Sequence, residues 1–569
     1  MKVLRKFIKI IAWIISVILF LLILVYILIQ IPAVQNFAKN KVVAYIEGKI
    51  KTKVSADRLS IAFPKQVVLK GVYFEDQQKD TLLFAKELRV DIALFKLLGN
   101  EVNINYLELN GFRTDVHRLQ RDTSFNFDYI IKAFAGGQKK EPQPQDTSNT
   151  IKFHLDRIVF KDILIKFKDD HTGNDVYFYL GDFETKINTF DPDKMIFDVS
   201  SIQIKNIDAT IHRYRPSIEQ AADTAFNAET PSVKLDELIL SKININYTDD
   251  ISAMQADINV GEFIMHPAFI SLKKSLVKLE DVSLKDSKAN IAIGKAEKFP
   301  GKGKEETKPD SSQQWGLDIA KINLDNNDFR YDDNTQPRIN TGIDYNHLHT
   351  QHLYVHADSL SANPSGYKAY IRQAAFKEQS GFDLQKLETV FSYTDTSAIL
   401  DNFLLKTDQT LLKDKIIVKY PSIKELSKKP GDIYIDAHFD HCSIAAKDIL
   451  TFAPQLYGNL KGNEQAVVQL NAGIKGFVKN ISIPFFQLNG FTNTVIDLSG
   501  SIAGLPDAKK AVYNININRL RSSSNDIYKL APEKSIPPDI RIPQAFSAKG
   551  YFKGTVKQFQ TLLELNSSD

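Results

Sequence analysis

Four histidines lie close together in the second half of the chain: His347, His349, His352 and His356. Imidazole is a common zinc ligand, and residues two apart on a strand share a face, so a metal site is one interpretation. By this spacing only His347 and His349 share a face, and no carboxylate or cysteine completes a ligand set. We therefore expect surface histidines on a strand and no bound metal.

A second group combines His438, His441 and Cys442. In a strand the two histidines would face opposite sides, and in a helix they would lack further ligands, so we expect no metal here either. Cys442 is the only cysteine, which excludes an intramolecular disulfide and a cysteine metal cluster. This cysteine content is typical of a periplasm-facing or cytosolic protein.

Acidic pairs recur at nearly even spacing as Asp169-Asp170, Asp249-Asp250 and Asp332-Asp333. Calcium ligation is one interpretation. Each pair, however, follows an alternating pattern that ends in Phe or Tyr, where aspartate typically caps a turn by accepting hydrogen bonds from backbone N–H groups. We predict turns at these positions. The pairs also mark an internal repeat, which we call the acidic-pair repeat.

Signatures of catalysis are missing from the sequence. It holds no Gly-x-Ser-x-Gly elbow, Walker loop, His-Glu-x-x-His motif or Rossmann fingerprint. We therefore expect no enzyme and no cofactor. The 72 basic and 68 acidic residues include four basic residues within the first nine, so the rest of the chain is formally neutral. That balance argues against nucleic acid as a partner.

The N-terminus predicts a membrane anchor. Residues 10–29 carry no charge, and at about 1.5 Å per residue they span the roughly 30 Å hydrocarbon core of a bilayer. A cleaved signal peptide is the alternative, but its apolar region would be about 7–15 residues long. We expect a cytoplasmic basic tail at 1–9 and a single transmembrane helix at 10–31, with the body across the membrane.

The hydrophobic period then changes from helix to strand. Apolar residues three and four apart predict a short amphipathic helix over 32–48. Alternation of period two follows, with asparagine or lysine between apolar residues, as in 103–106, 163–168 and 243–247. Polar stretches at 136–150, near 216–231 and near 298–314 predict loops or mobile insertions. We divide this body into a β region at 49–135, a repeating groove at 151–435 and a last part at 436–569.

The last part contains a second repeat, which we call the C-terminal repeat. Asp448-Ile449 and Ala453-Pro454 recur at one fixed offset as Asp526-Ile527 and Ala531-Pro532. Short helices are expected before each proline, over 443–452 and 524–530.

A sheet with one apolar face must cover that face. The sequence supplies almost no amphipathic helices for the purpose, so two folds remain: a self-packed sandwich, or an open trough lined for an outside hydrophobe. The repeats and the membrane anchor favour the trough. The predicted fold is therefore mainly β, with an N-terminal transmembrane helix followed by an elongated, curled, repeating β-groove and few short helices.

The N-terminal region resembles the AsmA-like superfamily, and most closely its TamB-like members. The resemblance rests on the basic start, the membrane helix, the proline-headed helix and four strand-like segments, and later on a glycine-rich segment at 500–506. The four segments are Leu59-Ser60-Ile61-Ala62-Phe63-Pro64, Leu69-Lys70-Gly71-Val72, Ala85-Lys86-Glu87-Leu88-Arg89-Val90 and Ile104-Asn105-Tyr106-Leu107-Glu108-Leu109-Asn110-Gly111.

This resemblance implies an inner-membrane protein whose β-trough lies in the periplasm. It also implies phospholipids as cargo moving towards the outer membrane, and in some members assembly of outer-membrane proteins with a barrel partner. TamB-like chains are usually much longer than this one, which ends within a strand pattern, so we interpret it as a truncated chain or as one part of a split protein.

The function we expect is lipid transport without catalysis. Acyl chains would lie in the trough while head groups follow its open seam. The alternative is a scaffold for outer-membrane protein assembly, with a dry, self-packed interior. The candidate lining positions are Ile104, Tyr106, Ile163, Ile165, Phe167, Ile243, Ile245 and Tyr247.

Overall fold

The chain folds mainly into β-strands, which hold 63% of the residues, with 15% in helices. This confirms the predicted fold class: a mainly β protein with an apolar N-terminal helix and few short helices. The structure is a computed structural model. It describes residues 2–62, 66–93, 96, 101–134, 152–192, 194–216, 231–296, 315–530, 536 and 541–568.

Two helices begin the chain. α1 (Lys2–Gln30) contains, at Ile11–Gln30, the one stretch in the described residues that is long and apolar enough to cross a membrane. α2 (Pro32–Ile50) starts with proline at its first turn and runs two residues past the predicted end at 48. The other helices are short: α3 (Asp128–Phe134), α4 (Ala446–Phe452), α5 (Tyr457–Leu460) and α6 (Ser524–Leu530), with 3-10 turns η3 (Ile423–Glu425), η4 (Pro430–Asp432) and η5 (Pro454–Leu456).

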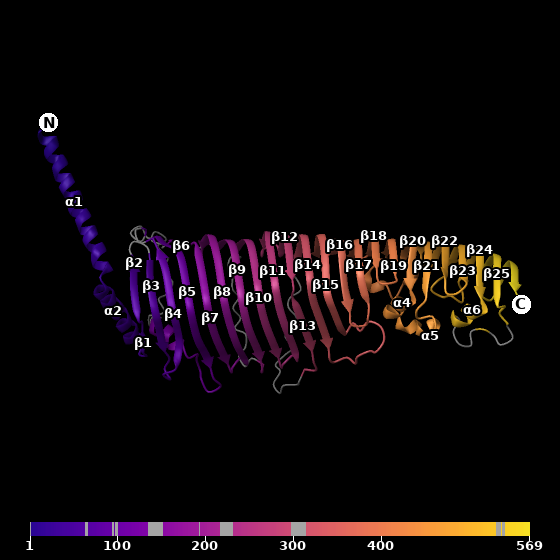
Figure 1. Ribbon diagram of the computed structural model, residues 1–569, viewed down its shortest axis with the longest axis horizontal. Helices are drawn as coiled ribbons and strands as arrows, with labels where there is room; N and C mark the ends of the chain where they lie inside the picture. Colours follow the sequence, from indigo (N-terminus) through magenta and orange to yellow (C-terminus); the bar gives the residue numbers. More distant parts are fainter. Residues whose placement is uncertain are drawn as a thin grey trace. The chain divides into compact units, whose positions relative to one another are not determined.

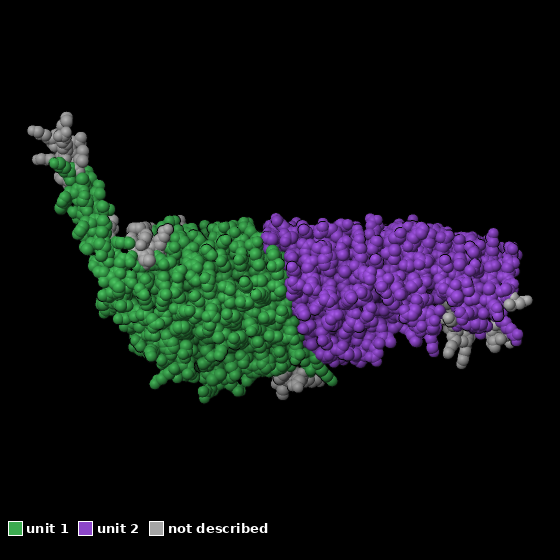
Figure 2. Space-filling view, viewed as in Figure 1, with its two compact units in different colours: residues 1–264, 270–273, 294–306 green, residues 265–269, 274–293, 307–569 purple. Residues whose placement is uncertain are grey.

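The chain divides into two compact units (Figure 2). Unit 1 comprises residues 1–264, 270–273 and 294–306, and unit 2 comprises residues 265–269, 274–293 and 307–569. Within each unit the strands lie side by side (Figure 1). Strand β11 (Met254–Ser271) contributes residues to both units.

Unit 1 mixes antiparallel and parallel pairing. β3 pairs antiparallel with β1, β2 and β4, and β4 with β5, but β6 and β7 run parallel to β5. β7, β8 and β9 are antiparallel again, and β10 runs parallel to β9. The strands are β1 (Val54–Ser55), β2 (Arg58–Ala62), β3 (Gln66–Glu75), β4 (Thr81–Ile92), β5 (Glu101–Arg118), β6 (Lys152–Leu155), β7 (Arg157–Asp169), β8 (Asn174–Asp191), β9 (Ile196–Arg213) and β10 (Ser232–Asp249).

Unit 2 begins with one parallel step and continues antiparallel. β12 and β13 run parallel to β14, and from β14 onwards each strand pairs antiparallel with the next. The strands are β12 (Leu276–Lys285), β13 (Lys288–Ile293), β14 (Gly316–Asp333), β15 (His347–Asn363), β16 (Gly366–Glu378), β17 (Asp383–Thr394), β18 (Ser397–Lys406), β19 (Leu411–Lys419), β20 (Tyr434–Ala445), β21 (Val467–Phe477), β22 (Asn480–Gly490), β23 (Thr494–Ala503), β24 (Val512–Ser523), β25 (Ala545–Gly554) and β26 (Phe559–Ser568).

The parallel steps explain the acidic-pair repeat. β7, β8 and β9 form an antiparallel meander, so β9 runs in the same direction as β7. β10 is parallel to β9, and it therefore starts at the end of the sheet opposite to the end where the chain leaves β9. The polar stretches predicted at 136–150, near 216–231 and near 298–314 come before the parallel strands β6, β10 and β14 in the sequence, and they lie largely outside the described residues.

Along the long strands β9 and β10, successive apolar residues are separated by two, three, two, three, two and two positions in the sequence. Each step of three places one extra residue on the polar face, as with the exposed neighbours Lys205 and Asn206. The polar face therefore has more rows of side chains than the apolar face, so the sheet bends with its apolar face inside. The series is Phe197, Val199, Ile202, Ile204, Ile207, Ala209 and Ile211 in β9, and Val233, Leu235, Leu238, Leu240, Ile243, Ile245 and Tyr247 in β10.

At the second step of three in these strands, the backbone adopts an unusual conformation. Gly111, Asp162, Asn206 and Lys242 adopt left-handed conformations, with φ of 63°, 53°, 63° and 56°. Pairing continues on both sides of each, so these residues form a row across unit 1. A left-handed residue within a strand acts like a bulge, bending the strand and changing which face the next side chain takes. A Cβ on Gly111 would lie 2.7 Å from the Cβ of Lys86, so glycine suits this position.

We predict that Asn206→Val destabilises the protein by about 1–2 kcal/mol, because a β-branched residue tolerates the left-handed region poorly. Asn206→Gly should stay within about 0.5 kcal/mol of the native chain, since glycine adopts this region freely. Urea unfolding of the full chain in detergent, followed by circular dichroism, measures both. Gln203→Val, on the polar face of the same strand, is the control, and an Asn206→Val midpoint equal to that of the control would contradict the proposed bend.

Candidate functional site

The candidate site is the concave apolar face of the sheet. In unit 1, strand pairing aligns its side chains in rows, one of which joins Ile163, Leu180, Ile207 and Ile243. The opposite face carries ionic residues at matching positions, such as Lys161, beside Asp182 and then Lys205.

Seven of the eight predicted lining residues lie on this apolar face. Those on β7 and β10 occupy the same three rows, and they are Ile163, Ile165, Phe167, Ile243, Ile245 and Tyr247. Ile104 lies between Ile92 and Leu155 in a further apolar row. The prediction did not include the residues of these rows that lie on β8 and β9. For β9, the spacing of its apolar residues in steps of two and three is the sequence signal that identifies them.

Tyr106 lies on the polar face instead. Its hydroxyl donates to a Glu108 carboxylate oxygen at 3.0 Å, and the Arg157 guanidinium lies 5.5 Å from the centre of its ring. Glu108 also accepts from Lys161 Nζ at 3.1 Å, which makes this a cluster of ion pairs. Burial, together with the neighbouring Glu108 carboxylate, raises the pKa of Tyr106. Simple alternation would place Ile104 and Tyr106 on the same face of the sheet. A bulge at Asn105 puts them on opposite faces.

The apolar face is only partly buried along its rows. Ile163 and Ile243 are 5% and 4% exposed at the inner corner of the bend, whereas Ile165, Ile245 and Tyr247 remain half-buried. In the described residues no helix or second sheet packs as a layer across β8, β9 and β10. At one end Phe125 does approach Phe167, with ring centres 5.8 Å apart. Within the described residues, this apolar face therefore has no second layer packed against it.

A row of charged residues borders this face in unit 1. Arg118 donates to both carboxylate oxygens of Asp169 at 2.9 and 2.8 Å, and Arg213 lies 3.7 Å from Asp249. Asp169 and Asp249 also accept from the backbone N–H two residues ahead, of His171 and Ile251.

In the third acidic pair the second aspartate forms the turn. Asp333 accepts from the N–H of Thr335 at 3.0 Å, again two residues ahead. The predicted turn role of the acidic pairs is therefore confirmed.

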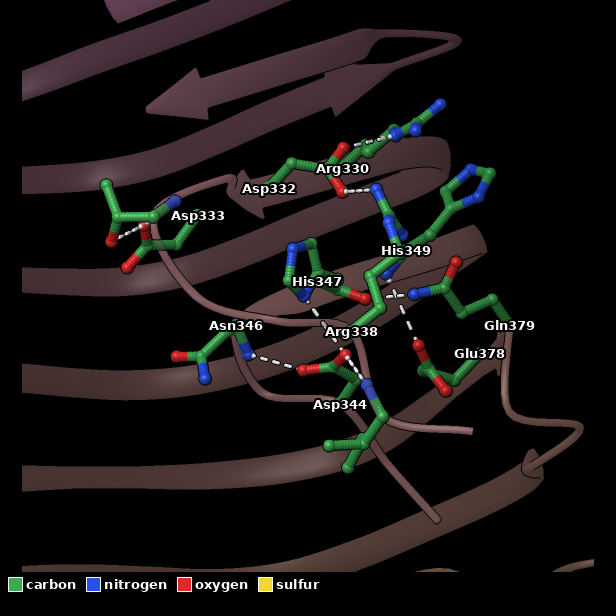
Figure 3. Close-up of polar contacts among 12 residues, drawn as sticks. Arg330, Asp332, Asp333, Arg338, Asp344, Asn346, His347, His349, Glu378 and Gln379 are labelled. Carbon is green, nitrogen blue, oxygen red and sulfur yellow. Dashed lines mark hydrogen bonds and ion pairs between the residues drawn. The ribbon is translucent and has the colours of Figure 1, made fainter. Parts of the chain in front are cut away.

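The histidines of β15 make separate local contacts. Nδ1 of the buried His347 lies 3.0 Å from Asp344, which also accepts from the N–H of Asn346 (Figure 3). His352 contacts Asn326, and His356 contacts Asp325 at 3.0 Å.

In the second histidine group, His438 contacts Asp414 and His441 contacts Asp440, while Cys442 is fully buried. Across the described part of the chain, no three His, Cys, Asp or Glu side chains are grouped to hold a metal ion.

Acid should destabilise unit 1 through Asp169. Burial of this carboxyl raises its pKa, but hydrogen bonds from Arg118, Thr172 and the backbone of His171 outweigh burial and lower the pKa to about 2. The stabilisation is therefore complete above pH ~4, the unfolded-state value, and is lost as the pH falls towards 2. We expect Asp169→Asn to cost about 1–2 kcal/mol at pH 7 and to flatten the acid limb of the stability profile. Asp175→Asn, at an exposed site nearby, is the control, and an unchanged acid limb in Asp169→Asn would refute this assignment.

The chain matches no protein-family model, and no curated protein is similar enough to it to be identified as a relative.

Proposed function

We propose that this protein conducts phospholipids along the apolar face of its sheet, from an inner-membrane anchor towards the outer membrane. The single observation that carries the proposal is the open apolar face, whose rows run from strand to strand within a unit. A lipid can lie against such rows without being enclosed. The resemblance to TamB-like proteins supports the same function, with the body in the periplasm.

The energetics of such a face suit transport. A fully buried methylene gains about 0.8 kcal/mol, and a methylene that touches protein on one side only gains roughly half of that. Rows of Ile, Val, Leu and Phe repeat on neighbouring strands, so each step along the face exchanges one apolar contact for a similar one. Acyl chains would therefore be held without a deep minimum, and the direction of movement requires an outside energy source.

The anchor is tied to the first strands of unit 1. The buried side-chain amide of Gln35 in α2 donates to the carbonyl of Ile29, at the end of α1, and to that of Ile61, in β2, at 2.9 and 3.2 Å. Tyr129 of α3 donates to the carbonyl of Glu75 at 2.7 Å. In this proposal these contacts hold the beginning of the lipid path beside the membrane-spanning helix.

The alternative is a scaffold for outer-membrane protein assembly, acting through a barrel partner. That function requires a dry interior packed by its own side chains. The half-buried Ile165, Ile245 and Tyr247 favour the lipid path over this alternative.

Ile245→Asp tests the lipid path. Ile245 lies on the apolar face and is only half-buried, so the change places a carboxylate against the acyl chains while sparing the buried corner at Ile243. We expect the full chain purified with this change to retain several-fold less phospholipid by mass spectrometry. Asn246→Asp adds the same charge on the opposite face of β10 and should retain the native amount.

Thermal unfolding of both variants checks that they are folded. Equal phospholipid in the two folded variants, or no phospholipid with the native chain, would count against the lipid path.

A further inference from the structure

A cavity of about 550 Å³ lies in unit 2 at the ends of strands β14 to β17. Aromatic and apolar side chains supply much of its wall. Among the residues that line it are Trp315, Pro364, Tyr367, Tyr393, Asp395 and Ile423.

Strand register places this cavity on the apolar face. Leu317 pairs with Ala362, Ala362 pairs with Tyr367, and Tyr367 pairs with Tyr393, so one row leads from the apolar series of β14 to the two tyrosines. Trp315 precedes Leu317 by two residues and lines the same cavity. A lipid lying on the apolar face of unit 2 would therefore have this cavity at the border of its path.

The far wall of the cavity is fixed by hydrogen bonds. The N–H of Ile423 in η3 donates to the carbonyl of Asp395 at 3.0 Å, and the hydroxyl of the buried Tyr420 donates to the carbonyl of Thr394 at 2.9 Å. These bonds hold η3 against the turn that joins β17 to β18. This side of the cavity is therefore held in place by hydrogen bonds of the fold.

The chemistry of the lining selects a cation. Trp315 and Tyr367 are 50% and 56% exposed, so their ring faces are accessible. Among the described residues that line the cavity, Asp395 is the one charged side chain, and none of these residues is a lysine or an arginine. Aromatic faces attract cations through their quadrupoles, and quaternary ammonium groups are bound by such aromatic cages. A phosphate would meet the Asp395 carboxylate without a compensating positive charge.

We propose that this cavity binds the ammonium group of a lipid head group while the acyl chains lie on the apolar face of unit 2. This inference rests on the proposed lipid path and adds the chemical class of head group that the path recognises. The ligand class is a zwitterionic phospholipid whose amine is primary or quaternary.

The two tryptophans of the chain make the test direct. Trp13 lies in α1, so Trp13→Phe leaves Trp315 as the only tryptophan and as a reporter inside the cavity. The full Trp13→Phe chain in neutral detergent is titrated with dihexanoyl phosphatidylcholine and, separately, with dihexanoyl phosphatidylglycerol, both below their micelle concentrations. We expect a saturable change in Trp315 fluorescence with phosphatidylcholine and at least tenfold weaker binding of phosphatidylglycerol.

Variants identify the residues responsible. Tyr367→Leu and Asp395→Asn should each weaken phosphatidylcholine binding about fivefold to tenfold, and Tyr367→Phe should keep it because the aromatic face remains. Tyr370→Leu is the matched control, since Tyr370 lies on the same strand but its side chain points to the opposite face. Native affinity in both Tyr367→Leu and Asp395→Asn would overturn the inference.

Other outcomes separate this inference from the lipid path. Equal responses to the two lipids would overturn the head-group site, and phospholipid co-purifying with the native chain would still support the path. A titration with tetramethylammonium chloride tests whether the cavity binds a free cation. Binding of tetramethylammonium without binding of phosphatidylcholine would contradict the inference that the ammonium group belongs to a lipid.

Discussion

The structure depends on one constraint: a single layer of strands has an apolar face that its own bends must shelter. In unit 1 each step of three along the long strands places an extra residue on the polar side, and at the second of these steps left-handed residues such as Asn206 and Lys242 interrupt the strands. This makes the apolar face concave. Ile163 and Ile243 are then buried at the corner with no second layer among the described residues, and the neighbouring Ile165 and Ile245 remain partly exposed.

Much of this fold can be predicted from residue patterns. The apolar anchor, the β class, the short helix at 524–530 and the turn-capping aspartates all follow from local rules. The face of Tyr106 does not, because counting by twos assumes an unbroken strand. Lys242 carries no sequence signal for its left-handed conformation. The cavity at Tyr367 and Tyr393 also escapes prediction, since it depends on which strands become neighbours.

The two internal repeats differ in strand number, and this difference governs their connections. The acidic-pair repeat contains three long strands in unit 1, and its successive copies meet in parallel, as β9 and β10 do. The C-terminal repeat spans four strands, β20 to β23, and the even number lets β24 continue the antiparallel order. In this repeat the short helices α4 and α6 follow β20 and β24. The buried carboxylates of Asp448 and Asp526 in these helices accept hydrogen bonds from nearby hydroxyl groups.

The row of left-handed residues also bears on how such a protein changes in evolution. Each strand contains its own bends, and its neighbour needs only to match the register. The cross-section of the sheet is therefore specified strand by strand and is independent of how many strands there are. Duplication or loss of a three-strand segment would change the length of the sheet and leave the profile of its surface intact.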